Sequence, residues 1–332
     1  MYDVVTIGSA TRDVFVIPEG AVIEKSDKFQ TGEGICFSLD SKIDVPELYY
    51  KTGGSAINAA VSFALQGLSV ASLCRVGNDI RGESIIGRLK EVGASDELVT
   101  KDSGRLTAYS VILTAGGHRT VLVHRGATEY LCHDEPIPFD KLKQTKWFYI
   151  SHLGGESGKI FAQLIDFADE HGIRVAVNPG STQLKMKEEL HTLMAKIDVF
   201  ILNQEEASAL TGIPYEKEEE IFSTLDKLVK GFVIMTKGPE GFTACDNENV
   251  YRAGILKEPK YMDRTGAGDA FGAGTVAWII KERPLDEALQ AGSANATGVL
   301  GEWGANEGLI SIQEDIYKFG RLDIAKSACN YD

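Results

Sequence analysis

From residue 145 onward, short apolar runs alternate with segments of helical periodicity, and this alternation limits the folds that the chain can adopt. Strands are expected at 147–151, 174–178, 199–202 and 232–236, and helices at 160–171, 205–210 and within 218–230. Such a pattern is typical of a parallel sheet whose strands are joined by crossover helices. An apolar run at 4–7 that ends at Gly8 adds a buried strand. We therefore predict an α/β fold with a mostly parallel central sheet flanked by helices.

Two segments, 13–50 and 105–128, contain runs with the two-residue periodicity of exposed strands instead. Gly116-Gly117 separates the runs 109–114 and 120–124 and predicts a hairpin between them. The two segments can pair into one small sheet outside the core. We expect an α/β core formed by residues 1–12, 51–104 and 129–332, and a β lid formed by residues 13–50 and 105–128.

The chain of 332 residues has a formal net charge of −14, from 34 Lys plus Arg against 48 Asp plus Glu. A long polyanion is repelled by such a surface unless basic residues gather on one face, and no basic run occurs, so we expect no nucleic-acid partner. A small anion such as a nucleotide remains compatible, because local backbone dipoles, a few cations and Mg²⁺ can hold it.

The five cysteines are scattered and never form a Cys-x-x-Cys pair, which favours reduced thiols in a cytoplasmic protein. No apolar stretch of membrane-spanning length is found, and the first residues do not have the pattern of a secretory signal. We expect neither export nor membrane association. The six histidines show no metal-ligand spacing.

A glycine turn at 266–268 leads into an apolar helix, with Asp269 at its start. Free amides at a helix N-terminus bind phosphate, and a carboxylate there can accept the proton of an attacking hydroxyl. The alternative is that Asp269 only caps the helix while the glycines permit close packing. The dinucleotide motif G-x-G-x-x-G fails because Phe271 replaces its third glycine, and no G-x-x-x-x-G-K-[ST] occurs.

Over nearly its whole length the chain resembles the ribokinase-like, or PfkB, family of carbohydrate kinases. The run 53–60, continuing to Gly67 and Gly77, matches the family's N-terminal signature, and 266–269 with Ala273-Gly274 match its C-terminal one. The resemblance implies a three-layer ribokinase-like fold with a small β-sheet lid. It also implies ATP-dependent transfer of the γ-phosphoryl group to a hydroxyl of a small sugar, with Mg²⁺ as a cofactor.

The same resemblance assigns roles to the residues that bind the phosphates. Asp269 is expected to be the general base, and the amides of Gly266, Ala267 and Gly268 the anion hole. Glu206 is expected to help place Mg²⁺ through water, with Asn203 facing the phosphates. Without the resemblance, the pattern Asn203-x-x-Glu206 indicates a capped helix start.

Nucleotide contacts are expected at the end of the 232–236 strand, from Thr236, Lys237 and Gly238, with Gly241 in the next turn. The resemblance also places Asn295 near the adenine, while a structural asparagine on a helix surface is the alternative. The cluster 216–220 is interpreted as a solvated helix start.

The acceptor is expected to bind Asp13, whose carboxylate can accept bonds from two hydroxyls. Gly53 and Gly54 would bring backbone close to the acceptor, and Asn58 would add an amide. By local sequence alone Asp13 is equally a turn residue. Arg125 could contact an anionic group of the substrate, while a surface arginine is the alternative.

Asp263 resembles part of the family's monovalent-cation loop, which implies K⁺ as a further cofactor. Arg264 departs from the family's pattern, and we hypothesise that its guanidinium reduces the need for K⁺. The exposed lid face further suggests a homodimer through the lid. Two other functions stay open: a nucleoside kinase of the same superfamily, and a non-catalytic sugar- or nucleotide-binding regulator.

Overall fold

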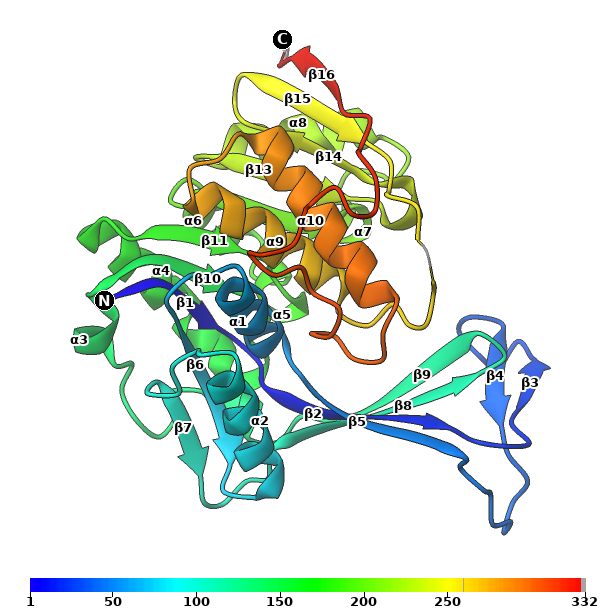
Figure 1. The fold of residues 1–332 in the computed structure, drawn as a ribbon. Coiled ribbons are helices and arrows are strands. Elements are labelled where there is room, and N and C mark those ends of the chain that lie inside the picture. Colours follow the sequence, from blue (N-terminus) through cyan, green and yellow to red (C-terminus); the bar gives the residue numbers. More distant parts are fainter. Residues whose placement is uncertain (259, 330–332) are drawn as a thin grey trace.

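The computed structural model describes residues 1–258 and 260–329, and one large sheet runs through it (Figure 1). Its strands are β1 (Tyr2–Ile7), β6 (Val70–Gly77), β7 (Val99–Asp102), β10 (Thr145–Ile150), β11 (Arg174–Val177), β12 (Val199–Asn203), β13 (Phe232–Thr236), β14 (Phe242–Cys245), β15 (Asn249–Ala253) and β16 (Ala325–Ala328). The ten strands follow the order β16-β15-β14-β13-β12-β11-β10-β1-β6-β7. Neighbours from β7 to β13 are parallel, and those from β13 to β16 are antiparallel. The predicted mostly parallel sheet is confirmed.

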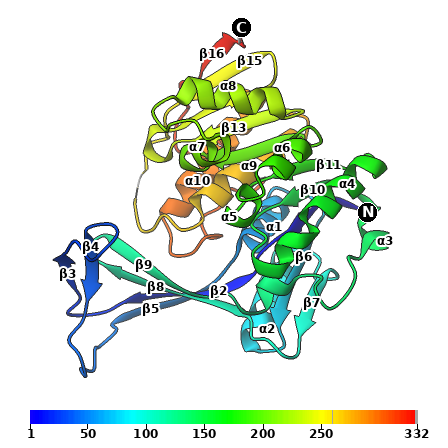
Figure 2. The ribbon, with the colours of Figure 1, turned by 180° about the vertical axis from the view of Figure 1, so that it is seen from behind.

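Helices cover both faces of this sheet (Figures 1 and 2). One layer contains α1 (Ser55–Leu65), α2 (Ile80–Glu91), α9 (Ala267–Ile280) and α10 (Leu285–Leu300), and the other contains α4 (Phe161–His171), α6 (Glu188–Met194), α7 (Gln204–Thr211) and α8 (Glu218–Leu228). Shorter elements are α3 (Phe139–Leu142), α5 (Ser181–Leu184), η1 (Gly126–Tyr130), η2 (Gly155–Ile160) and η3 (Gly238–Glu240). Val4 packs into one hydrophobic cluster and Val5 into the other, because successive side chains of a strand point to opposite faces. The three-layer prediction is confirmed.

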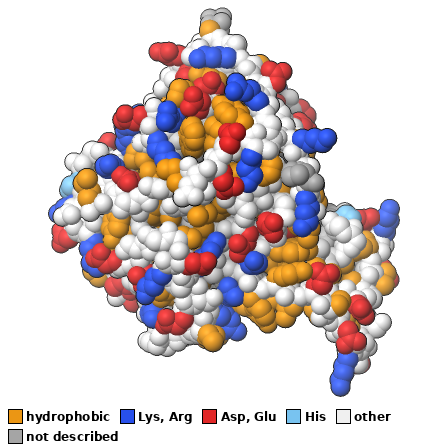
Figure 3. Space-filling view, viewed as in Figure 1, with side chains coloured by type: hydrophobic (Ala, Val, Ile, Leu, Met, Phe, Trp, Pro, Cys, Tyr) orange, Lys and Arg blue, Asp and Glu red, His pale blue; other side chains and the backbone are white. Residues whose placement is uncertain are grey.

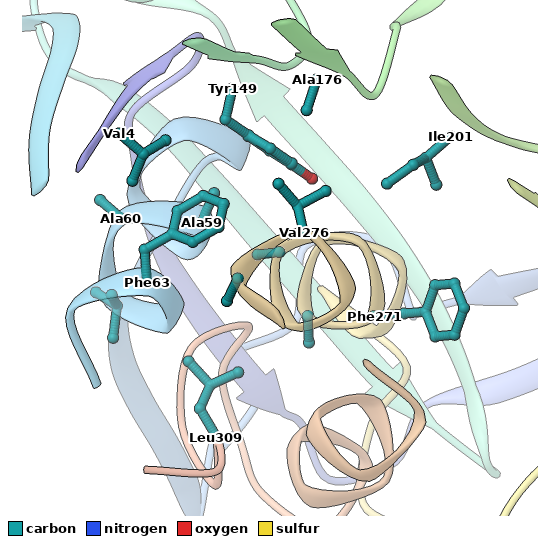
Figure 4. Close-up of a cluster of buried hydrophobic side chains, with 14 of the residues drawn as sticks. Val4, Ala59, Ala60, Phe63, Tyr149, Ala176, Ile201, Phe271, Val276 and Leu309 are labelled. Carbon is teal, nitrogen blue, oxygen red and sulfur yellow. The ribbon is translucent and has the colours of Figure 1, made fainter. Parts of the chain in front are cut away.

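Helix α9 lies at the centre of one hydrophobic cluster, and its glycines allow it to approach its neighbours closely (Figure 4). A Cβ atom on Gly272 would lie 2.8 Å from the hydroxyl of Tyr149, and one on Gly274 would lie 2.9 Å from Asn295 Nδ2. Tyr149 also packs edge-on against Phe63 of α1, with 5.2 Å between ring centroids. This close packing fixes the N-terminus of α9, where the predicted phosphate-binding turn lies.

A second sheet extends away from the core and brings the two predicted lid segments together (Figures 1 and 2). Its strands are β2 (Thr11–Ile17), β5 (Glu47–Gly53), β8 (Ala108–Ala115) and β9 (His118–His124), in the order β5-β2-β8-β9. A separate hairpin of β3 (Val22–Lys25) and β4 (Glu33–Cys36) lies at the far end of this sheet. The hairpin predicted at Gly116-Gly117 is present, and both glycines have positive φ, 56° and 77°. We call the four-stranded sheet the lid sheet.

Among the described residues, no helix has the length and apolar character that a membrane span requires. Figure 3 shows acidic and basic side chains interspersed over the face in view, with hydrophobic side chains gathered where the lid sheet leaves the core.

Candidate active site

The turn before α9 has a backbone that only glycine adopts easily. Gly266 is the N-cap of the helix and has φ of 82°, in the left-handed region. A Cβ atom there would lie 2.6 Å from Ala305 Cα, whereas a Cβ atom on Gly268 would meet no described atom within 4 Å. The turn is therefore packed at Gly266 and open at Gly268. The amide of Ala267 donates to Arg264 O at 3.2 Å, so that donor is already used within the turn.

Asp269 is half-buried in the first turn of α9 and is held by a chain of amides. Asn58 Nδ2 of α1 donates to Asp269 Oδ2 at 2.8 Å. Asn306 Nδ2 in turn donates to Asn58 Oδ1 at 3.0 Å and to Thr52 O at 2.9 Å. Asn306 is 2% exposed and Asn58 is 4% exposed, so competing water is largely excluded. The orientation of Asn58, and with it that of Asp269, is set by Asn306.

Asn306 was missed by sequence reasoning. It lies in a loop after α10, in Gly304-Ala305-Asn306, and no local pattern distinguishes it from a surface asparagine. Only the folded chain brings it within hydrogen-bond distance of Asn58, 248 residues away in sequence.

The site gathers three aspartates, and the two beside the proposed acceptor position are harder to ionise than usual. Burial raises the pKa of Asp269, the hydrogen bond from Asn58 lowers it, and the charge of Asp13 raises it further. Burial also raises the pKa of Asp13, and the nearby charge of Asp263 adds to this rise. A carboxylate with a raised pKa holds a proton more strongly, which is the property that a general base needs.

Asp13 lies on β2 of the lid sheet, where β2 leaves the core. Its Oδ1 accepts a hydrogen bond from Thr11 Oγ1 at 3.0 Å. A Cβ atom on Gly53 would lie 2.9 Å from Asp13 Cγ, and one on Gly54, with φ of 91°, would lie 2.7 Å from Ala10 Cα. Both glycines are therefore required for the backbone to approach the Asp13 strand.

Asp263 is linked to the lid sheet by an ion pair. Arg119 Nη1 on β9 lies 3.0 Å from Asp263 Oδ1, and Asp263 Oδ2 accepts the amide of Thr265 at 2.7 Å. Asp263 is 6% exposed. Arg264 does not contact Asp263: it is exposed and its guanidinium lies over the Tyr261 ring, 5.6 Å from the centroid. The guanidinium that the structure brings to Asp263 is therefore that of Arg119, while that of Arg264 lies over the Tyr261 ring.

Asn203 and Thr236 lie side by side at the carboxyl ends of β12 and β13, where they are register partners. Asn203 Oδ1 accepts the amide of Glu206 at 2.8 Å, and Glu206 Oε2 accepts the amide of Asn203 at 2.9 Å. This reciprocal pair is a capping box for α7. Burial raises the pKa of Glu206. The capping geometry that was an alternative to the nucleotide role is thus present, and it leaves Glu206 Oε1 outside the two capping bonds.

Lys237 follows Thr236, and its ammonium is bound by an acidic side chain of α8. Lys237 Nζ lies 3.0 Å from Glu218 Oε1, which also accepts from Thr243 Oγ1 at 2.9 Å. The helix start expected within 216–220 is present because α8 begins at Glu218, and the Glu218 side chain also has specific partners. Gly238 and Gly241 both have positive φ, 55° and 94°. A Cβ atom on Gly241 would lie 2.6 Å from Gly254 Cα, so this turn also needs glycine.

Asn295 is fully buried between helices, not on a helix surface. Its Nδ2 donates to Ser62 Oγ at 2.8 Å and to Ala270 O at 2.9 Å, while its Oδ1 accepts the amide of Ile310 at 2.8 Å. These bonds occupy the side-chain amide in joining α1, α9 and the loop after α10. We therefore leave Asn295 out of the proposed nucleotide site.

Arg125 lies at the start of η1, and its side chain is 51% exposed. Arg125 Nε is 3.5 Å from Glu129 Oε1. Burial lowers the pKa of His152, and the positive charge of Arg125 adds to this lowering.

These features define a class: an α/β protein whose glycine-capped helix, lid sheet and clustered aspartates meet at one place. The chain belongs to the pfkB family of carbohydrate kinases, whose family description matches residues 3–312. It is therefore an ATP-binding kinase of the sugar and nucleoside kinase group.

Three similar proteins illustrate the range of this family. Cytidine kinase of Thermococcus kodakarensis is 24% identical over 307 residues, covering 92% of this chain and 98% of that protein. A ribokinase of Arabidopsis thaliana, solved with ribose and ATP, has a TM-score of 0.76 at 20% identity, covering 96% of this chain and 98% of that one. A putative ribokinase II from E. coli, solved with ATP and Mg²⁺, has a TM-score of 0.78 at 19% identity, covering 96% and 99%. The ribokinase-like fold is thus shown, while the similar proteins include both sugar and nucleoside kinases.

Proposed function

We propose that this protein transfers the γ-phosphoryl group of ATP to a hydroxyl of a small sugar, with Asp269 as the general base. The observation that carries the proposal is the position of Asp269. It stands in the first turn of α9, beside Gly268, and Asn58 fixes its carboxylate. The raised pKa of Asp269 suits a group that must take a proton.

In the proposed reaction, the acceptor oxygen attacks the γ-phosphorus while the bond from that phosphorus to the leaving ADP oxygen breaks. The hydroxyl proton passes to the Asp269 carboxylate. Amides of Gly266, Ala267 and Gly268 stabilise the charge on the transferring group, and each such donor is typically worth about 3 kcal/mol. Because the Ala267 amide donates to Arg264 O, it must share or release that bond to serve the phosphate.

The nucleotide is proposed to lie along the carboxyl edge of β12 and β13, near Asn203, Thr236 and the turn of Gly238 and Gly241. Mg²⁺ supplies charge neutralisation for the phosphates when it is bound. Glu206 fits a role in holding it through water, because its Oε1 lies outside the capping bonds and Mg²⁺ prefers carboxylate and water ligands. Lys237 stays a proposed contact that first has to leave Glu218.

The acceptor is proposed to lie between Asp13 and Asp269, with Gly53, Gly54 and Asn58 around it. The carboxylate of Asp13 can accept hydrogen bonds from hydroxyl groups, and the charge of Asp13 contributes to the raised pKa of Asp269. Arg125 stays available for an anionic substituent because half of its side chain is exposed.

Arg119 is proposed to take the place of a monovalent cation at Asp263. The ion pair already compensates the buried carboxylate, so K⁺ has no charge left to balance there. Rates measured in potassium chloride and in choline chloride of equal ionic strength should agree, and strong activation by K⁺ would contradict this role.

A nucleoside kinase is the second candidate, and one feature of the lid favours it. Val121 and Val123 lie on the same face of the lid sheet as Asp13, and they are 42% and 49% exposed. Exposed apolar surface near the acceptor would suit a nucleobase. The similarity to a cytidine kinase also supports this candidate.

The opposite face of the lid sheet is proposed to pair with a second copy of the chain. Leu48, Tyr50 and Leu122 share that face and are 46%, 55% and 55% exposed. Apolar side chains of this size are costly to leave in water. Light scattering of the purified protein should give the mass of a homodimer, and that of Leu122→Asp should give the mass of a monomer.

A panel of sugars and nucleosides, each offered with ATP, GTP and ADP, tests the proposed reaction. Phosphorylation of a sugar with ATP, detected by mass spectrometry of the product, is expected. Turnover of nucleosides alone would support the second candidate. No transfer to any acceptor would contradict both.

A further inference from the structure

Two cysteines and an aspartate meet at the edge of the large sheet that is farthest from the lid (Figure 1). Asp226 is on α8, Cys245 ends β14 and Cys329 directly follows β16. One ligand atom from each of the three residues lies within 4.8 Å of the others. No role in the proposed phosphoryl transfer uses this cluster, which we call the thiol cluster.

The distances within the thiol cluster fit the edges of a tetrahedron around zinc. Cys245 Sγ and Cys329 Sγ are 3.5 Å apart, and Cys329 Sγ is 3.4 Å from Asp226 Oδ2. Zinc binds sulfur at about 2.3 Å and carboxylate oxygen at about 2.0–2.2 Å, which gives tetrahedral edges of about 3.8 Å between sulfurs and about 3.5 Å between sulfur and oxygen. These two separations differ from the tetrahedral edges by only a few tenths of an ångström, and the third pair lies within 4.8 Å.

The carboxylate of Asp226 points to a missing cation. Asp226 is 9% exposed, and within residues 1–258 and 260–329 its Oδ1 has no hydrogen-bond partner. The other contacts of its carboxylate within the cluster come from the thiols of Cys329 and Cys245, which are weak donors. A buried carboxylate with so little compensation is unfavourable unless a cation joins it.

We propose that Asp226, Cys245 and Cys329 form a zinc site, with water as the fourth ligand. Sulfur ligands select zinc over Mg²⁺ or Ca²⁺, which prefer oxygen. Binding converts both thiols to thiolates and releases their two protons. Cys245 is fully buried and Cys329 is half-exposed, so the ion enters from the side of Cys329.

Zinc at this position would fasten the end of the chain to the core. Strand β16 is the edge strand of the sheet, and its side chains are exposed. The ion would connect the residue after β16 with β14 and with α8. Bound zinc should therefore raise the thermal stability of the protein. None of its three ligands is assigned to catalysis, although α8 also carries Glu218, the partner of Lys237, at its other end.

Cobalt titration of the reduced, metal-free protein tests the proposal, because Co²⁺ bound by thiolates has a characteristic sulfur-to-metal absorption band. One Co²⁺ per chain with this band is expected, and Zn²⁺ should abolish the band by displacement. Cys245→Ser and Cys329→Ser should each lose tight binding. Asp226→Asn should keep the band but bind at least about tenfold more weakly. Cys36→Ser, which removes a half-exposed thiol of β4, is the matched control and should behave like the wild type.

Thermal unfolding gives a second measurement that does not need the kinase reaction. Zn²⁺ should raise the Tm of the wild type and of Cys36→Ser, but not that of Cys329→Ser, because an ion stabilises only the state that binds it. Cys329 is half-exposed and follows the edge strand β16, outside the main core, so this variant should fold. The absence of a thiolate band in the reduced protein, or a band that persists in Cys245→Ser, would overturn the zinc site. Isolation of a Cys245–Cys329 disulfide that binds no Co²⁺ after reduction would also overturn it.

Discussion

Replacing Asn306 with alanine would release the amide chain that holds the proposed base. Asn306 Nδ2 is the donor to Asn58 Oδ1 at 3.0 Å and to Thr52 O at 2.9 Å. Without it, the Asn58 amide is free to turn, and its Oδ1 can face the Asp269 carboxylate in place of Nδ2. Both the stability of the protein and the placement of Asp269 should suffer.

The expected size follows from the two acceptors that lose their donor. Each buried acceptor left without a partner costs about 1–3 kcal/mol in the free energy of unfolding. If the transition state loses about 1–3 kcal/mol of stabilisation because Asp269 is no longer held in place, kcat falls by about 5–150-fold, since 1.36 kcal/mol is a factor of ten. The acid limb of the kcat–pH profile should also move, because the hydrogen bond from Asn58 lowers the pKa of Asp269. Its loss shifts that limb to higher pH.

Initial rates over a range of pH, with ATP and the acceptor that the panel identifies, measure both effects. Asn249→Ala on β15 removes an amide that bonds Asp246 far from the site, and it should leave kcat and the acid limb unchanged. If Asn306→Ala keeps the wild-type kcat and the wild-type acid limb, the amide chain does not position Asp269. A loss of Tm alone would give Asn306 a structural role only and would refute the reasoning.

Three further results are expected. Arg119→Met leaves Asp263 without its cation, so KM for the acceptor should rise by about fivefold, as for the loss of about 1 kcal/mol, and K⁺ but not choline should restore part of it. Gly266→Ala forces a side chain into the left-handed region against Ala305 and should lower stability by about 2–4 kcal/mol in urea unfolding, whereas an alanine at the open position 268 should not. Burial raises the pKa of Asp269 in the folded protein above its usual value near 3.8. The folded state therefore loses stability as the pH rises from about 3.8 to the raised pKa, where Asp269 ionises. Asp269→Asn should therefore melt above the wild type at neutral pH, with the difference vanishing in acid; an equal Tm at neutral pH would contradict the burial argument.

Much of the fold could be predicted because its signals are local. Apolar runs such as 199–202 and 232–236 read directly as buried strands, and they pair in parallel as β12 and β13. The glycine-rich segments 53–67 and 266–274 also indicated the family. Resemblance to a family placed Asn58 and Asp269 in one site, and they lie 2.8 Å apart although 211 residues separate them in sequence.

The parts that sequence reasoning missed depend on contacts between distant segments. Arg264 drew attention as a departure from the family's pattern next to Asp263, but its guanidinium lies over Tyr261, and the guanidinium at Asp263 belongs to Arg119 of the lid, 144 residues away. Asn295 looked like a ligand or a surface residue, but the packing of α9 against α10 buries it completely. No local sequence pattern predicts either the ion pair of Asp263 or the burial of Asn295, because both depend on how the helices and strands pack.

The central claim is that Asp269 accepts the proton of the acceptor hydroxyl. Its most direct test is the single-turnover rate of γ-phosphoryl transfer from labelled ATP, compared between the wild type and Asp269→Asn, with ATP affinity measured by calorimetry on both. The asparagine keeps the shape of the side chain and can still meet Asn58, so ATP should bind with similar affinity. The transfer rate should fall by about 10²–10⁴-fold. A transfer rate close to that of the wild type would contradict the account.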